Sequence, residues 1–185
     1  MRLFIAIAPD RAMRDALISV QDALRVQGVR GSYAPPENLH LTLAFIGEFG
    51  DPDAVLAAME TLAFAPFSLR LDRLGAFDEV WWAGLEQSEA LDALVRQLRH
   101  ALAEAGIPFD RKSFRAHITL LRRPVFPRDR RPAAPPVPRA EMRVQRVSLM
   151  LSTRGKHGMI YTELGAVAAR PEAISGSGRE RTESE

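Results

Sequence analysis

The chain has 185 residues, a net charge of +2 and 46% hydrophobic residues, enough to form one good-sized core. It contains no cysteine, which excludes thiol nucleophiles, disulfides and Cys-ligated zinc. No stretch approaches the roughly 20 apolar residues of a membrane span, and the apolar run at residues 3–8 is too short for a secretory signal, so we expect a cytoplasmic protein with no membrane partner.

The first part of the chain predicts a mixture of strands and helices. Residues 3–8 are rich in Ile, Ala and Phe, which is typical of a buried strand. The period of the apolar residues then predicts an amphipathic helix over 10–27, which Gly28 ends. The other expected elements are an extended approach from Tyr33 to Glu37, a strand over 39–46 ended by Gly47, a helix over 53–63 capped by Asp51 or Asp53, and strands over 67–74 and 80–85 joined by a turn at 75–79.

The second part repeats the alternation of helix and strand. A strongly amphipathic helix is expected over 88–105, followed by a strand over 115–121. Six prolines between 124 and 138 exclude a regular element, so a long basic loop is expected there. Residues 144–152 and 159–165 predict a closing hairpin, and the polar residues beyond 170 predict a disordered tail.

One four-residue motif occurs twice, as His-Leu-Thr-Leu at residues 40–43 and, 77 residues later, as His-Ile-Thr-Leu at 117–120. Alternate side chains of a strand point to opposite faces, so the His and the Thr of each copy share one face. The aliphatic residues, together with Phe45, are expected to pack under helices and hold the strands rigid. A lone His on a strand is more often structural, but two copies in matching surroundings argue against coincidence.

Two histidines on neighbouring strands suit the hydrolysis of a cyclic phosphodiester. Water attacks phosphorus in line with a departing ribose oxygen, so one group must accept a proton and another must donate one. Histidine does either near neutral pH, and the hydroxyls of Thr42 and Thr119 can donate to the phosphate oxygens. Zinc is a rival use of His40 and His117. It needs a third protein ligand, which no H-E-x-x-H or Cys set supplies, so neither a metal nor a cofactor is expected.

Positive charge is concentrated around the second motif. Residues 111–146 contain eleven Arg or Lys but only two acidic residues, a net +9, which leaves −7 on the remainder of the chain. Such a stretch suits an anionic partner such as RNA. A solvated surface that keeps the protein soluble is the alternative that charge alone leaves open.

Three stretches together resemble one known family. They are residues 1–7, residues 36–43 with Phe45 and Gly47 after them, and residues 114–120 with Arg122. Over residues 1–167 the chain is similar to the bacterial RNA 2',3'-cyclic phosphodiesterases of the two-histidine phosphoesterase superfamily, also called 2'-5' RNA ligases. The resemblance implies an α+β fold: one bilobal domain over 1–167 whose pseudo-two-fold symmetric lobes form a central cleft from antiparallel sheets, with helices packed outside. Residues 168–185 lie outside the resemblance, and their composition predicts a disordered tail.

The resemblance also implies an activity, the metal-independent hydrolysis of RNA 2',3'-cyclic phosphate ends to 2'-phosphates. By analogy, His40 would be the proton donor to the 3'-oxygen and His117 the proton acceptor from water. Thr42 and Thr119 would grip the phosphate. The partners would be RNA ends, such as those of tRNA fragments, or small cyclic nucleotides, and the protein would act as a monomer.

Three further residues are candidates for binding the substrate. Arg122 matches the family's arginine after the second motif. Strict alternation nevertheless places it on the face opposite His117, so it reaches the phosphate only if the strand ends or twists before it. Arg115 has the correct parity and is the substitute. Tyr33 stands where the family usually has Trp and is the candidate for stacking on a base, while Ala116 replaces a usual Pro.

Two other functions stay open. The same groups could join a cyclic phosphate end to a 5'-hydroxyl by microscopic reversibility, which would make the protein a 2'-5' RNA ligase. Alternatively, it could bind RNA without turnover, a function that the basic proline-rich loop favours. Symmetry between the motifs does not say which histidine is the acid.

Overall fold

The computed structural model describes residues 1–77, 79–129 and 132–171, and within them nine strands form one sheet. The strands are β1 (Arg2–Ile7), β2 (Arg30–Tyr33), β3 (Leu41–Glu48), β4 (Phe67–Phe77), β5 (Val80–Leu85), β6 (His117–Val125), β7 (Glu141–Val144), β8 (Arg146–Gly155) and β9 (Gly158–Ala168). The helices are α1 (Arg11–Val26), α2 (Pro52–Glu60), α3 (Glu89–Glu104) and the single 3-10 turn η1 (Pro36–Asn38).

The sheet is antiparallel and nearly symmetric about its middle. Its order is β7-β4-β5-β6-β3-β1-β8-β9, and β2 pairs with β6 beside this path. The two strands that follow the motif histidines, β3 and β6, therefore meet at the centre, with three further strands of the path on each side. They pair at Leu41 and Ile118, which are the second residues of the two motifs. The pseudo-two-fold axis thus passes between corresponding residues.

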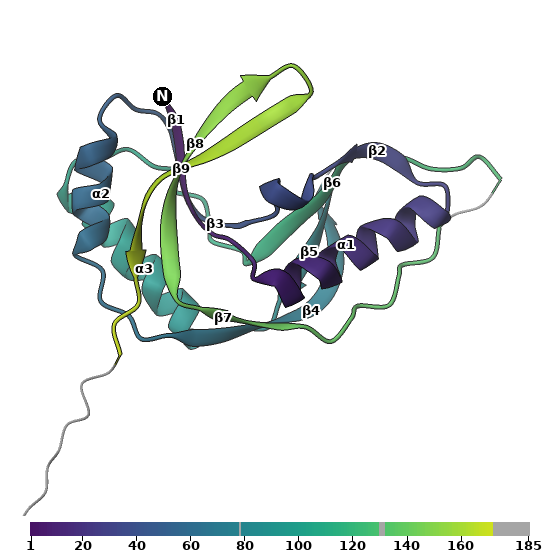
Figure 1. Ribbon diagram of the computed structural model, residues 1–185, viewed down its shortest axis with the longest axis horizontal. Coiled ribbons are helices and arrows are strands. Elements are labelled where there is room, and N and C mark those ends of the chain that lie inside the picture. Colours follow the sequence, from purple (N-terminus) through teal and green to yellow (C-terminus); the bar gives the residue numbers. More distant parts are fainter. Residues whose placement is uncertain (78, 130–131, 172–185) are drawn as a thin grey trace, which may run out of the picture.

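The helices cover the outside of this curled sheet (Figure 1). α1 packs against β6 and β7, while α2 and α3 pack against each other and against β9 and β3. One half of the sheet, β3-β1-β8-β9, draws strands from both ends of the chain, whereas the other half, β7-β4-β5-β6, comes from the middle of the chain. The second half is therefore inserted in sequence between strands of the first.

All three predicted α-helices are present, and side-chain caps fix where they begin. The carboxylate of Asp10 accepts a hydrogen bond from the amide of Met13 at 2.9 Å, and Asp51 accepts one from Ala54 at 3.0 Å. Ser88 caps α3 in the same way. These bonds satisfy amide groups that have no partner within the helix. Of the two predicted caps for α2, Asp51 is therefore the one that is used.

The strands differ from the prediction where pairing is long-range. β2 was not predicted, and only its last residue, Tyr33, fell in the expected extended approach, because its sequence shows no alternation of apolar and polar side chains. It becomes a strand by pairing with β6. β6 begins at His117 rather than 115 and runs on to Val125, past the expected end at 121. β7 was not predicted as a separate strand, and it adds to the edge of β4.

Other parts of the prediction have definite outcomes. The proline-rich loop was expected from 124 onward, but Pro124 and Val125 still belong to β6; its other described residues, 126–129 and 132–140, contain no helix or strand, as expected. The closing hairpin is present as β8 and β9, and both strands are longer than predicted. Most of the predicted tail, from 172 onward, lies outside the described residues. Within the described part of the chain, no helix is long and apolar enough to cross a membrane.

Candidate active site

The two motifs lie side by side with the predicted alternation of side chains. His40 immediately precedes β3, and His117 is the first residue of β6. The histidine and threonine of each copy are partly exposed, whereas the aliphatic residues of the motifs are 0–1% exposed. Paired residues share a face, and Leu41 pairs with Ile118, so the four polar side chains lie on one face of the sheet. We call it the motif face.

Both imidazole rings are held by the same hydrogen bond. Nδ1 of His40 lies 2.7 Å from the carbonyl oxygen of Asn38, and Nδ1 of His117 lies 2.7 Å from that of Arg115. A carbonyl oxygen can only accept, so Nδ1 carries a proton in both rings. Nε2 is then a proton acceptor in the neutral ring and a donor in the charged one. Either histidine can therefore act as acid or base.

Each imidazole also packs against two aromatic rings. These contacts fix the ring planes, and the aromatic partners lie on strands other than the motif strands. The distances between ring centroids are 4.9 Å from His40 to Phe4, 5.2 Å from His40 to Tyr161, 5.4 Å from His117 to Phe77 and 6.2 Å from His117 to Trp82. No local pattern in the sequence predicts these four contacts, because only strand pairing brings the rings to the motifs.

A bulge in β6 changes where Arg122 points. The register between β5 and β6 passes from Trp82 opposite Thr119 to Trp81 opposite Leu121, so Leu120 is an extra residue. Such a residue reverses the alternation beyond it. Arg122 therefore lies on the motif face, although strict alternation predicted the opposite face. The departure from a regular strand that Arg122 needs in order to face the phosphate takes the form of this bulge.

A matching bulge in β3 changes the position of Phe45. The register between β1 and β3 skips Leu43, passing from Thr42 to Ala44. Phe45 was expected in the core with Leu41 and Leu43, and that prediction is wrong: its ring is partly exposed and lines a cavity beside the motif. Because each bulge follows the motif threonine, Phe45 and Arg122 occupy corresponding places in the two strands.

The electrostatic surroundings of His40 favour its neutral form. Burial is the largest cause that lowers its pKa, and the positive charges of Arg122 and His117 lower it further. The hydrogen bond to Asn38 acts in the opposite direction. The influence of Arg122 on His40 indicates that the guanidinium charge reaches across the centre of the sheet to the first motif.

Arg115 and Tyr33 have different positions. The guanidinium of Arg115 lies 5.4 Å from the centre of the Phe77 ring, beside His117, so the structure brings Arg115 to the site. Tyr33 packs under the guanidinium of Arg25 on α1 at 4.1 Å, and its hydroxyl donates to the carbonyl of Val29 at 2.8 Å. Burial raises the pKa of that hydroxyl. Tyr33 is thus held against α1, and its role as a base-stacking residue stays a prediction.

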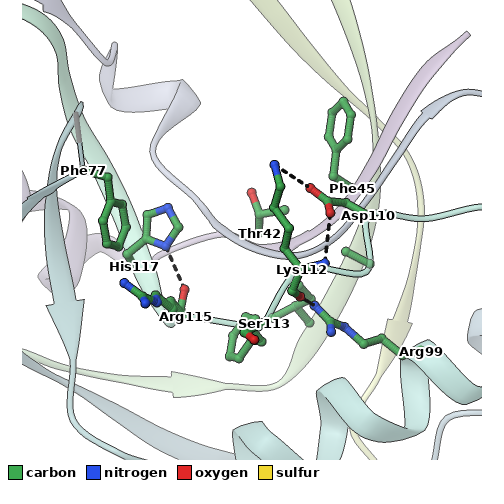
Figure 2. A pocket seen from close by; sticks show the side chains of 12 residues that line it. Thr42, Phe45, Phe77, Arg99, Asp110, Lys112, Ser113, Arg115 and His117 are labelled. Carbon is green, nitrogen blue, oxygen red and sulfur yellow. Dashed lines mark hydrogen bonds and ion pairs between the residues drawn. The ribbon is translucent and has the colours of Figure 1, made fainter. Parts of the chain in front are cut away.

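A cavity of about 440 Å³ opens beside the motifs (Figure 2). Thr42 and His117 line one end of it, with Phe77 next to His117. The remainder is lined by residues of β3 up to Phe45, by Arg99 on α3, and by residues 110 and 112–115 of the segment that connects α3 to β6. Within the described residues, no three His, Cys, Asp or Glu side chains gather to hold a metal ion.

Comparisons with known proteins agree with this geometry. Residues 14–156 match the model of the 2'-5' RNA ligase superfamily. An RNA 2',3'-cyclic phosphodiesterase of Thermus thermophilus is 35% identical over 93% of this chain and 92% of its own length. The protein of the same name from Archaeoglobus fulgidus is 33% identical over 65% of this chain and 71% of its own.

Solved structures are similar over nearly the whole chain. The crystal structure of a Thermus thermophilus protein superimposes with a TM-score of 0.77 and 33% identity, covering 94% of this chain and 100% of the other. Escherichia coli LigT in complex with 3'-AMP gives a TM-score of 0.74 at 28% identity, covering 91% and 96%. These similarities confirm the predicted α+β fold with two motif strands at its centre.

Proposed function

The chain belongs to the 2'-5' RNA ligase superfamily, and we propose that it hydrolyses RNA 2',3'-cyclic phosphate ends with His40 and His117 as its acid and base. The observation that carries this proposal is the matched orientation of the two rings, each with Nδ1 hydrogen-bonded to the carbonyl two residues earlier. Both Nε2 atoms are then available for proton transfer. The relatives named RNA 2',3'-cyclic phosphodiesterase support the same reaction.

The reaction requires one proton to be taken up and one to be given. Nε2 of His117 accepts a proton from water as its oxygen attacks phosphorus. The bond from phosphorus to the 3'-oxygen breaks on the opposite side, and Nε2 of His40 donates its proton to that oxygen. The products are a 2'-phosphate and a free 3'-hydroxyl. His40 and His117 end the cycle in exchanged protonation states, which solvent restores.

The remaining polar groups of the motif face stabilise the phosphate. Thr42 and Thr119 supply hydroxyl donors to its non-bridging oxygens, where negative charge builds up in the transition state. Arg122 adds a positive charge near His40. Arg115 supplies a second cation beside His117.

The assignment of acid and base is the part of the mechanism that needs its own test. In the free protein, the lowered pKa of His40 favours the neutral ring. A bound phosphate anion offsets the charges of Arg122 and His117 and so favours the protonated ring that a donor needs. A substrate with sulfur in place of the 3'-oxygen has a leaving group that needs no acid. We expect it to rescue His40→Ala but not His117→Ala, and the reverse pattern would exchange the two roles.

We further propose that the protein acts as a monomer in the cytoplasm, on RNA ends such as those of tRNA fragments or on small cyclic nucleotides. A single chain supplies every residue of the site described above, which supports action as a monomer. The absence of cysteine suits a reducing compartment. Sedimentation at working concentration tests the oligomeric state.

End-group analysis tests the reaction. An oligonucleotide with a 2',3'-cyclic phosphate is incubated with the protein in EDTA, together with a second oligonucleotide that carries a 5'-hydroxyl. We expect a linear 2'-phosphate. A 3'-phosphate product would contradict the proposed bond cleavage, and a 2'-5' junction would indicate ligation instead.

Alanine variants test the two histidines. His40→Ala and His117→Ala are each expected to lose about 10²- to 10⁴-fold in kcat, because this is the usual contribution of a general acid or base. Binding of RNA should fall much less. His100→Ala is the control, since His100 is exposed on α3. Full activity in both motif variants would refute the catalytic roles.

A further inference from the structure

The cavity beside the motifs extends the reaction site along β3. Thr42 and His117 line it, so it is continuous with the place where the phosphate reacts. Figure 2 shows it passing from Phe77 and His117, across Thr42, toward Phe45. Its volume of about 440 Å³ lies in the range of small-molecule pockets. There is thus room for more of the substrate than the cyclic phosphate.

Phe45 offers an aromatic surface at the far end of the cavity. The bulge in β3 places its ring on the motif face. The guanidinium of Arg2 lies 5.1 Å from the ring centre on one side, while the ring also borders the cavity. Stacking on an aromatic ring is the usual way in which proteins hold a nucleobase of single-stranded RNA without reading its identity.

The backbone around Lys112 is fixed beside this ring. The amide of Asp110 donates to the carbonyl of Phe45 at 2.8 Å, which ties the segment to β3. The carboxylate of Asp110 accepts a bond from the Lys112 amide at 3.0 Å, and the guanidinium of Arg99 donates to the Lys112 carbonyl at 2.9 Å. The position of Lys112 over the cavity is therefore built into the fold.

The ammonium group of Lys112 is available to an anion. It lies 3.7 Å from a carboxylate oxygen of Asp110, and the lysine side chain is 88% exposed. Such an exposed ion pair contributes little to stability, so an incoming phosphodiester can replace the carboxylate. Arg99 and Arg115 also line the cavity, which gives it three cations against the one carboxylate of Asp110.

We propose that this cavity is a second nucleotide subsite, which binds the nucleotide preceding the cyclic phosphate end of an RNA strand. Its base would stack on Phe45, and the phosphodiester that links it to the terminal nucleotide would lie at Lys112. This inference rests on the proposed function and adds a substrate class to it. The protein then prefers an RNA strand of two or more nucleotides to a mononucleotide.

The preference is measured as a ratio of kcat/KM values. The substrates are adenosine 2',3'-cyclic phosphate and the dinucleotide ApA with the same cyclic end. Wild-type protein is expected to favour the dinucleotide about tenfold, as one stacked base and one charge contact imply. Lys112→Gln and Phe45→Leu should each lower this ratio about threefold, because each removes one of the two contacts. Lys156→Gln, an exposed lysine in the β8–β9 turn, is the control and should keep the wild-type ratio.

Two outcomes would overturn the proposal. One is a wild-type ratio near one. The other is an equal loss on both substrates in Lys112→Gln and Phe45→Leu, which would mean that the cavity holds the reacting nucleotide itself. Thermal melting of each variant shows whether a loss comes from unfolding instead.

A binding measurement separates this inference from the proposed function. Calorimetry compares the affinities of adenosine 2'-phosphate and of ApA with a terminal 2'-phosphate, and neither ligand requires turnover. Tighter binding of the dinucleotide, lost in Lys112→Gln, without hydrolysis of either cyclic substrate would refute the proposed function and keep the subsite. Hydrolysis of both substrates with equal affinities for the two ligands would refute only the subsite.

Discussion

Each motif histidine depends on the residue two positions before it. In each copy the carbonyl of residue i−2 accepts the Nδ1 proton of the imidazole, from the end of the 3-10 turn η1 at Asn38 and from the coil before β6 at Arg115. Asn38 and Arg115 thus set the orientation of the rings through their backbones. Their side chains are free for other tasks, as the contact of Arg115 with Phe77 illustrates.

The burial of His40 predicts a dependence of stability on pH. Its pKa in the folded protein lies below the ordinary value of 6.5, so the unfolded chain binds a proton there first as the pH falls. The stability present above about pH 6.5 is therefore lost as the pH falls through the folded pKa. Urea unfolding from pH 7.5 to 5 should show a steeper loss for wild type than for His40→Gln.

The exposed His157 supplies the control for that measurement. His157→Gln should lose stability with falling pH as wild type does. If wild type and His40→Gln instead show the same slope, His40 does not titrate differently in the folded and unfolded states.

Gly31 is required where β2 crosses close to β6. Its φ is +144°, and a Cβ atom there would lie 2.8 Å from the carbonyl oxygen of Arg123 and 2.9 Å from that of Arg122. Gly31→Ala is expected to destabilise the protein by about 1–3 kcal/mol and to lower activity, because the backbone that carries Arg122 must shift. Gly50→Ala is the matched control, since nothing lies within 4 Å of its position. Urea unfolding that gives equal stabilities would contradict the close approach.

At the scale of elements, each motif strand holds a catalytic candidate on one face and the core on the other. The threonine of each motif is followed by one extra residue, Leu43 or Leu120. This extra residue turns the side chain two positions after it, Phe45 or Arg122, toward the site. The two bulges have different results, because the bulge in β3 presents the aromatic ring of Phe45 and the bulge in β6 presents the cation of Arg122. A symmetric frame thereby gives an asymmetric site.

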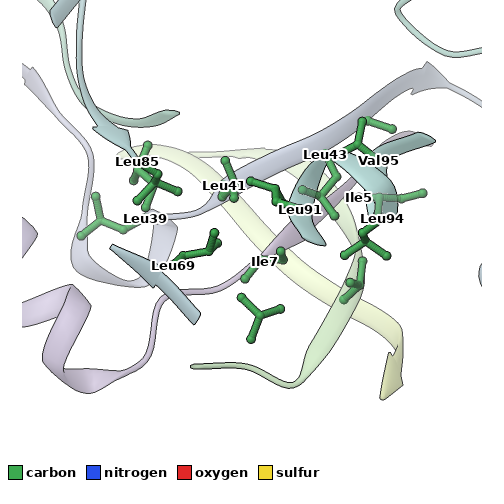
Figure 3. Packing of buried hydrophobic residues seen from close by; sticks show 14 of the residues in the cluster. Ile5, Ile7, Leu39, Leu41, Leu43, Leu69, Leu85, Leu91, Leu94 and Val95 are labelled. Atoms are coloured by element: carbon green, nitrogen blue, oxygen red, sulfur yellow. The ribbon is translucent and has the colours of Figure 1, made fainter. Parts of the chain in front are cut away.

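The core under the motifs predicts the effect of truncating Leu41. This side chain is 0% exposed and lies at the centre of the hydrophobic cluster, among residues of β3, α3 and β1 (Figure 3). Leu41→Ala is expected to cost about 2–5 kcal/mol in urea unfolding, because it leaves a cavity in a packed interior. Val26→Ala on α1 is the control, since Val26 is 86% exposed. A cost below about 1 kcal/mol for Leu41→Ala would mean that the core repacks freely.

At the scale of the molecule, the structure divides the basic segment of residues 111–146 into two parts. Lys112, Arg115 and Arg122 lie at the cavity or the motif face. The proline-rich loop instead follows α1, where the backbone of Ala133 exchanges two hydrogen bonds with the side chain of Gln27 at 2.8 and 3.0 Å. The described residues of the loop add nothing to the lining of the cavity.

This division predicts which cations matter to a short substrate. Arg122→Gln should lower kcat/KM for a dinucleotide that carries a 2',3'-cyclic phosphate end. It should also weaken the dependence of kcat/KM on salt between about 50 and 200 mM NaCl, because a phosphate contact is lost. The loop variant with both Arg128→Gln and Arg139→Gln should stay within about twofold of wild type. A larger effect of the loop variant would place RNA along α1.

The sequence by itself determined the local features of this protein. The three α-helices, the cap of α2 at Asp51, and the shared face of histidine and threonine in each motif follow from short-range periodicity and hydrogen bonding, and all of them are present. The alternation of side chains along a strand predicts which face each residue occupies only where the strand has no bulge. It therefore misplaced Phe45 and left Arg122 on the wrong face.

Only the tertiary structure decided what depends on pairing between distant residues. The bulges in β3 and β6 arise from register against β1 and β5, β2 becomes a strand by pairing with β6, and Tyr33 is drawn to α1. Pairing between distant residues also decides three further features. They are the insertion of one half of the sheet between strands of the other, the aromatic rings beside the histidines and the position of Lys112 over the cavity. Each of these requires contacts between segments far apart in the chain, and no local pattern of side chains encodes such contacts.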